Sequence, residues 1–223
     1  HGTSHKFVAS KAARLMGRDV KQMKIITCHL GNGASITAIK NGRSIDTSMG
    51  FTPVDGLIMG TRTGEIDAGV LIYIADKEHL NVTGVNNLIN KKSGVAGISG
   101  LSSDMRDLEI AAAEGNEKAL LALNMYAYKV RKFIGSYYAV LNGLDLLIFT
   151  GGVGENDHKM RAMICSDMEA LGIEFDRQAN DGVKGADKVI SKPGSKATVM
   201  TITTDEELVI AMDTQYIVEH HTI

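Results

Sequence analysis

Residues 146–156 read Leu146-Leu147-Ile148-Phe149-Thr150-Gly151-Gly152-Val153-Gly154-Glu155-Asn156, and this stretch indicates the fold class. Residues 146–150 are apolar or β-branched and predict a buried strand, which ends at the glycine-rich turn 151–154. A helix with an apolar face is predicted after the turn, and a second strand at 198–203 is again followed by a helix. Strands joined through a helix pair in parallel, so this half of the chain predicts an α/β sheet covered by helices.

The first part of the chain adds antiparallel strands to that sheet. Three β-rich runs at 23–28, 35–40 and 43–47 are separated by a glycine turn and by Asn41-Gly42, a dipeptide that favours tight hairpins. Apolar residues at helical spacing predict helices over 5–16 and 117–141, and residues 49–115 are interpreted as a helical insertion. We therefore predict one α/β domain with a mixed β-sheet flanked by helices.

Composition excludes several classes of protein. The chain of 223 residues has a net charge of -2 and no basic run, which argues against a nucleic-acid partner. No apolar stretch reaches the roughly 18 residues of a membrane span. Cys28 and Cys165 lie far apart, which suits a reducing cytoplasm and indicates no zinc site. The chain opens at His1 without an initiator Met or signal-peptide pattern, so we expect it to be a piece of a longer polypeptide.

Two glycine-rich segments are candidates for binding phosphate. Gly31-Asn32-Gly33 follows a strand, so its backbone N–H groups can approach an anion, although the segment taken alone is more typical of a plain hairpin turn. Residues 150–156 lie between a buried strand and a helix, where ligands of α/β sheets collect. That segment is neither a Walker A loop nor a GxGxxG motif, and a tight strand-to-helix connection is the alternative.

Charged and imidazole side chains offer further candidates. Arg62 stands between glycines and is suited to gripping a carboxylate or phosphoryl group, or else pairs with a nearby carboxylate on the surface. His1 and His5 precede a helix; with no third ligand a metal site is not expected, and a hydrogen bond to a phosphoryl oxygen is the better hypothesis. Glu206 is a candidate Mg²⁺ ligand, or a carboxylate favoured by the first turn of a helix.

The order of these motifs carries more information than any one of them. His1-Gly2-Thr3-Ser4-His5, the run 29–33, Phe51-Thr52-Pro53 leading into 60–62, Asp104-Met105-Arg106, residues 150–156 and Thr204-Asp205-Glu206-Glu207 follow one another along the whole chain. This succession resembles the acetate kinase family. The resemblance implies the actin-like fold (ribonuclease H-like, sugar-kinase superfamily), with residues 1–223 forming the C-terminal nucleotide-binding domain and the N-terminal domain absent.

The resemblance also implies roles for individual residues. His1 and Arg62 match the pair that stabilises the transition state, and Asn32 matches a residue near the transferring phosphoryl group. Glu206 matches the magnesium ligand, and Pro53 matches a residue beside the substrate methyl group. The implied nucleotide-binding residues are His29, Leu30, Gly31, Asn32 and Gly33, then Asp104, Met105 and Arg106, then Gly152, Val153, Gly154, Glu155 and Asn156.

The implied reaction is Mg²⁺-dependent, reversible phosphoryl transfer from ATP to acetate or another short-chain carboxylate, giving ADP and an acyl phosphate. A homodimer is expected, as in the family. Propionate kinase is the alternative, as is a nucleotide-binding and dimer-forming domain without activity. The family's Asp-Ile-Asp-Pro reads Glu65-Ile66-Asp67-Ala68 here. Because the carboxylate-binding arginine and catalytic aspartate belong to the first domain, we expect this chain alone to be inactive.

Overall fold

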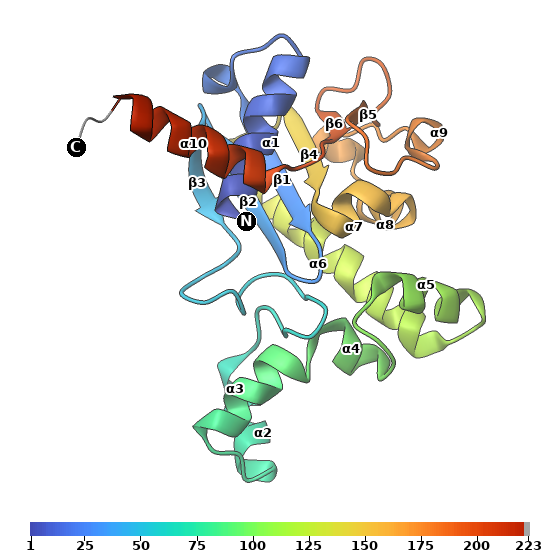
Figure 1. The fold of residues 1–223 in the computed structure, drawn as a ribbon. Helices are drawn as coiled ribbons and strands as arrows, with labels where there is room; N and C mark the ends of the chain where they lie inside the picture. The colour runs from blue at the N-terminus through green and yellow to red at the C-terminus, as the bar shows by residue number, and fades with distance from the viewer. Residues whose placement is uncertain (221–223) are drawn as a thin grey trace.

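The computed structural model, which describes residues 1–220, is built around one six-stranded sheet (Figure 1). Its strand order is β3-β2-β1-β4-β6-β5. The strands are β1 (Lys24–Leu30), β2 (Ala34–Lys40), β3 (Arg43–Thr47), β4 (Leu146–Thr150), β5 (Lys188–Val189) and β6 (Thr198–Thr201). The short strand β5 was not predicted, because two residues are too few to show an alternation of apolar and polar side chains.

The sheet is mixed, as the sequence predicts. β1 pairs antiparallel with β2, and β2 with β3. β1 and β4 pair in parallel, as do β4 and β6, while β5 runs antiparallel to β6. Asn41 and Gly42 both have positive φ angles, 54° and 76°, which is the geometry expected of a tight hairpin turn. The α/β class and the mixed sheet flanked by helices are therefore confirmed.

Helices cover both faces of the sheet. α1 (Gly2–Leu15) packs Val8, Ala9 and Ala12 on one face, in a cluster with residues of β1, β4 and β6. α6 (Glu117–Leu141) lies across the other face, in the larger cluster. The predicted helix over 117–141 has the same bounds as α6. Its buried side chains include Tyr126 and Tyr137, while Leu120 is exposed.

The segment between β3 and α6 is helical. It contains α2 (Ala68–Lys77), α3 (Val82–Lys91), the unpredicted α4 (Gly94–Ser99) and α5 (Met105–Ala113). α2 begins at Ala68 because the Asp67 carboxylate caps it. Asp104 caps α5 in the same way. In Figure 1, α2 and α3 project away from the sheet, and none of their residues is buried.

The glycine-rich segment after β4 is a helix and not a turn. α7 (Gly151–Asn156) begins directly where β4 ends, and α8 (His158–Ile164), α9 (Arg177–Asn180) and α10 (Glu206–His220) follow. α1 begins at Gly2, three residues before the predicted start at residue 5, and Ser4 is a buried residue inside it. At α10 the Asp205 carboxylate accepts from the N–H of Leu208. Within the part described, no helix has the length and apolar character that crossing a membrane requires.

One fully buried cation ties the α7–α9 region together. The guanidinium of Arg161 donates to the side-chain oxygen of Asn180 at 2.8 Å and to the carbonyls of Gly154 and Val183 at 2.9 and 2.8 Å. Burial lowers the pKa of Arg161 to about 10. Its donors satisfy three acceptors that water does not reach, so the side chain holds α7, α8 and the α9 loop together.

Replacing Arg161 with Met should lower the free energy of unfolding by about 3 kcal/mol, because three buried acceptors lose their donors. Urea unfolding measures this change. Arg177→Met, at an exposed position of α9, is the matched control and should stay within about 0.5 kcal/mol of the parent chain. Equal stability of the two variants would contradict the structural role of Arg161.

Candidate active site

The parallel pairing of β1 with β4 sets His29 opposite Thr150. The turn after β1 and the start of α7 therefore meet at the same end of the sheet. Gly151 has a φ of 78°, and a Cβ there would lie 2.8 Å from the carbonyl oxygen of Leu30. Only glycine allows this approach, so both glycine segments that the sequence singles out meet at one edge.

The loop that carries Arg62 is held against the first of these turns. The N–H of Gly60 donates to the carbonyl of Asn32 at 3.0 Å. A Cβ on Gly60 would lie 1.9 Å from the Asn32 side-chain oxygen, so the loop approaches as closely as glycine permits. As a result, a guanidinium nitrogen of Arg62 comes within 3.5 Å of where a Cβ on Gly33 would stand.

His1 reaches the same place from the start of α1. Its Nε2 also lies 3.5 Å from that position on Gly33, while its Nδ1 is hydrogen-bonded to the Ser35 hydroxyl at 2.7 Å. The ring packs on that of His29, with centroids 4.0 Å apart. The structure thus brings together His1, Asn32 and Arg62, the three residues predicted to be catalytic.

Of the two other histidines in this cluster, His5 is buried and His29 is half-buried, and both are neutral. His5 bonds Thr27 through Nδ1 and Ser35 through Nε2, and burial, with a smaller contribution from His29, lowers its pKa to about 3. Burial also lowers the pKa of His29, to about 4, and its Nδ1 is bonded to the Ser4 hydroxyl. The hydroxyls that orient these rings were not singled out from the sequence, because isolated Ser and Thr residues carry no motif.

A cavity of about 650 Å³ opens beside this cluster. Its lining includes Gly31 and Asn32 after β1, the run 103–106 before and within α5, and Gly152, Val153 and Asn156 of α7. Arg106 and Asp104 form a two-pronged ion pair, with contacts of 2.7 and 3.2 Å, which lowers the pKa of the Asp104 carboxyl. Segments remote in the sequence therefore share one wall of a nucleotide-sized pocket.

The far part of that cavity contains groups that sequence reasoning missed. They are Glu109, Asp157, His158, Lys159 and Lys184. Burial, and then the neighbouring Asp157 carboxylate, raises the pKa of Glu109 to about 7. Lys159 lies 3.6 Å from Glu109. Spacing along a helix offers no signal for this cluster, because α5 and α8 meet only in the folded chain.

Several residues predicted to bind nucleotide do not line this cavity: His29, Leu30, Gly33, Gly154 and Glu155. Of these, Gly154 and Glu155 have structural contacts in the α7 region. A Cβ on Gly154 would lie 3.3 Å from the backbone of Phe149, so this glycine lets α7 pack on β4. One oxygen of Glu155 accepts from the Thr150 hydroxyl and from the N–H groups of Gly151 and Thr204. Glu155 therefore ties the start of α7 to the link between β6 and α10.

The remaining predicted residues lie at the margins. Pro53 is exposed in the loop after β3. Glu206 is half-buried at the first turn of α10. Within residues 1–220 no three His, Cys, Asp or Glu side chains are grouped to hold a metal ion. A single carboxylate still fits Mg²⁺, which keeps several waters and binds through one or two carboxylates and substrate phosphates.

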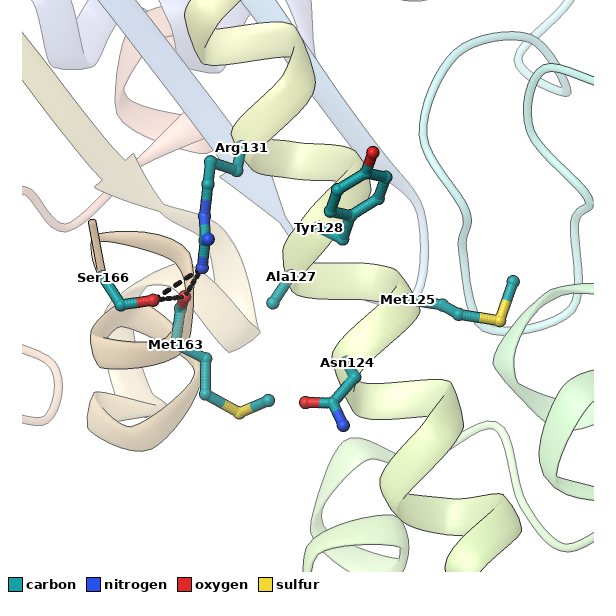
Figure 2. Close-up of a pocket in the computed structure, with 7 residues that line it drawn as sticks. All are labelled: Asn124, Met125, Ala127, Tyr128, Arg131, Met163 and Ser166. Carbon is teal, nitrogen blue, oxygen red and sulfur yellow. Dashed lines mark hydrogen bonds between the residues drawn. The ribbon is translucent and has the colours of Figure 1, made fainter. Parts of the chain in front are cut away.

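A second cavity, of about 440 Å³, lies between α6 and the end of α8, away from the predicted site residues (Figure 2). Its cation, Arg131, is already engaged: the guanidinium donates to the carbonyls of Met163 and Ile164 and to the Ser166 hydroxyl. Figure 2 shows the Arg131 side chain extending from α6 towards Met163 and Ser166; Met125 and Tyr128 belong to the same helix. The charge caps the end of α8, so this cavity lacks a free group for chemistry.

The model of the acetokinase family matches residues 1–212. An acetate kinase of Porphyromonas gingivalis (strain W83) is 53% identical over 219 residues, which is 98% of this chain and 55% of the relative. One of Phocaeicola vulgatus is 56% identical over 214 residues, which is 96% of this chain and 54% of the relative.

Solved structures give the same picture. The crystal structure of Porphyromonas gingivalis acetate kinase matches with a TM-score of 0.96 at 53% identity, over 98% of this chain and 55% of that one. A propionate kinase of Francisella tularensis matches with a TM-score of 0.89 at 44% identity, over 97% of this chain and 54% of that one. The chain spans about half the length of the curated relatives it matches.

The lowered pKa values of His5 and His29 predict how stability depends on pH. Their folded pKa values, about 3 for His5 and about 4 for His29, lie below the ordinary 6.5. As pH falls, the unfolded chain therefore takes up protons first, and stability declines from about pH 6.5 towards those values. Between pH 7.5 and 5 each ring should cost about 2 kcal/mol of the free energy of unfolding.

Urea unfolding of His29→Gln at the two pH values tests this expectation. The variant should lose about 2 kcal/mol less than the parent chain between pH 7.5 and 5. His79→Asn, at an exposed position with positive φ that Asn tolerates, is the control and should keep the parent's dependence. The same pH dependence in His29→Gln and in the parent would contradict the neutral state of the half-buried His29.

Proposed function

The chain belongs to the acetokinase family, and from this premise we propose that it is the C-terminal, nucleotide-binding half of an acetate kinase. The parent protein would transfer a phosphoryl group between ATP and acetate, with the actin-like fold that the resemblance implies. One observation carries the proposal: His1, Asn32 and Arg62, from three separate segments, converge beside Gly33 at the edge of the 650 Å³ cavity.

The convergence suits direct, in-line transfer. A carboxylate oxygen attacks the γ-phosphorus, the bond to the bridging oxygen of ATP breaks, and ADP leaves. Negative charge then spreads over the oxygens of the transferring group. The Arg62 guanidinium, the Asn32 amide and the His1 ring are donors that could bind those oxygens without rearranging, which is the main source of catalysis in such reactions.

The nucleotide would occupy the cavity between α5 and α7. Gly152 leaves the cavity wall open, since a Cβ there would meet no atom within 4 Å. Asn156 and the Asp104–Arg106 pair offer polar contacts for the nucleoside. Glu206 would hold Mg²⁺ together with waters and phosphate oxygens. The metal, when bound, would neutralise charge on the phosphates.

Acyl-chain preference has a second candidate. A propionate kinase is among the similar structures, so propionate is the alternative acceptor. Comparing kcat/KM for acetate and propionate in the complete polypeptide decides between them.

We also propose the homodimer that the resemblance implies. Val70, Ile72, Tyr73 and Val82, on α2 and α3, are 46–87% exposed, and such apolar groups commonly mark interfaces.

In the complete polypeptide, Arg62→Ala should lower kcat about 10³-fold while changing the KM for ATP little, because its charge is needed where negative charge develops. A coupled assay of acetyl phosphate formation measures both constants. Arg14→Ala, at an exposed position of α1, is the control and should keep normal turnover. Near-normal turnover of Arg62→Ala would remove Arg62 from the mechanism.

Gly152→Val should weaken binding of MgATP at least about tenfold, or about 1.4 kcal/mol, because the new side chain stands in the cavity. Calorimetric titration gives the affinity, and thermal unfolding checks that the fold is kept. Gly135→Val, on α6 with equally open surroundings outside the cavity, is the matched control. Unchanged affinity in a folded Gly152→Val protein would place the nucleotide elsewhere.

A further inference from the structure

A chain of hydrogen bonds runs from His1 into the interior of the sheet. His1 Nδ1 bonds the Ser35 hydroxyl at 2.7 Å, that hydroxyl bonds His5 Nε2 at 2.8 Å, and His5 Nδ1 bonds the Thr27 hydroxyl at 2.7 Å. Ser35, His5 and Thr27 are 1%, 5% and 0% exposed. The inner links, from Ser35 through His5 to Thr27, are therefore shielded from water, whereas the His1–Ser35 bond at the outer end is partly buried. Each bond must have one hydrogen of its own.

The chain of hydrogen bonds couples the positions of the ring hydrogens on His1 and His5. The Ser35 hydroxyl has one hydrogen and lies between two ring nitrogens, so it donates to one ring and accepts from the other. His5 is neutral, since burial lowers its pKa to about 3. If Ser35 donates to His1, His5 must donate to Ser35 from Nε2, and both neutral rings then carry their hydrogen on Nε2. In the reverse polarity both carry it on Nδ1.

At its Thr27 end, the chain of hydrogen bonds is compatible with both rings carrying their hydrogen on Nε2. The Thr27 hydroxyl can donate to His5 Nδ1 at 2.7 Å, or to the Thr37 carbonyl at 3.5 Å. A distance of 3.5 Å is too long for a strong O–H···O bond. Donation to His5 therefore loses little, and it leaves His5 with its hydrogen on Nε2.

The outer end favours the same polarity when an anion is present. Nε2 is the nitrogen of His1 that faces Gly33 and Arg62. A phosphoryl oxygen at this place has only lone pairs to offer, so it needs a hydrogen on Nε2. Arg62 already supplies a positive charge there, and His29, which packs on His1, is neutral, so a neutral donor suffices.

We propose that Ser35 and His5 are positioning residues that form a proton relay, which sets the Nε2–H form of His1 so that the neutral ring donates to a phosphoryl oxygen. The proposal rests on the proposed function and adds to it the protonation state of His1. It also explains why a buried histidine of α1 is linked to the site by a serine on β2.

Nitrogen-15 NMR of histidine rings in the complete polypeptide tests the relay at pH 7.5. Single His→Gln variants assign the signals. With MgATP bound, His1 and His5 should both be neutral and carry hydrogen on Nε2, although His5 does not touch the ligand. Without ligand the two rings should still share the same form, and in Ser35→Ala that correspondence should be lost. A doubly protonated His1 in the complex, or two rings with hydrogens on different nitrogens, would overturn the relay.

Kinetics separate the relay from a structural role. Ser35→Ala should lower kcat on the order of 10²-fold with the KM for ATP within about twofold, since a wrongly protonated imidazole loses the transition-state contact. Thr37→Val removes a neighbouring buried hydroxyl, which bonds Thr47, and should leave kcat unchanged. Equal losses in both variants would refute the relay. If the polypeptide forms no acyl phosphate, the proposed function fails, while the ring protonation without ligand still decides the relay.

Discussion

The parallel pairing of β1 with β4 is the interaction on which the candidate site depends. Parallel neighbours end at the same edge of a sheet, so the turn after β1 and the helix after β4 must meet there. Gly151 allows that meeting at a distance that no Cβ would permit. Once these two segments are in contact, the Arg62 loop can close on Asn32, and α1 can bring His1 to the same edge. A shift of β4 by one residue would turn its side chains to the opposite face and remove the register that sets His29 opposite Thr150.

Buried polar groups hold this edge rigid. Glu155 joins α7 to the segment before α10, Arg161 joins α7 to α8 and the α9 loop, and hydroxyls of Ser4, Thr27 and Ser35 orient the histidine rings. Such groups are costly to bury unless each finds a partner, and here the partners are supplied by different elements. The arrangement favours donors that stay in place while charge moves, which is what phosphoryl transfer demands.

Several surface helices expose apolar side chains that this chain does not cover. Of α10, only Val209 is buried, while Ile210, Met212 and Ile217 are more than half exposed. α2 and α3 likewise carry apolar side chains in water. A helix that is apolar around its circumference is normally covered by other protein. These helices fit the proposal that the chain is one half of a larger protein whose interfaces they form.

The amino-acid sequence by itself determined the strands β1 to β4, the whole of α6 and the hairpin at Asn41–Gly42, because each depends on patterns that neighbouring residues share. The order of the motifs also indicated the family. Only the tertiary structure decided that α7 starts at Gly151, that Gly154 serves packing, and that Ser35 connects two histidines. Glu109 and Asp157, too, meet only across α5 and α8. These features could not be read from the sequence because a contact between distant residues depends on how strands pair and helices pack, and no local spacing encodes it.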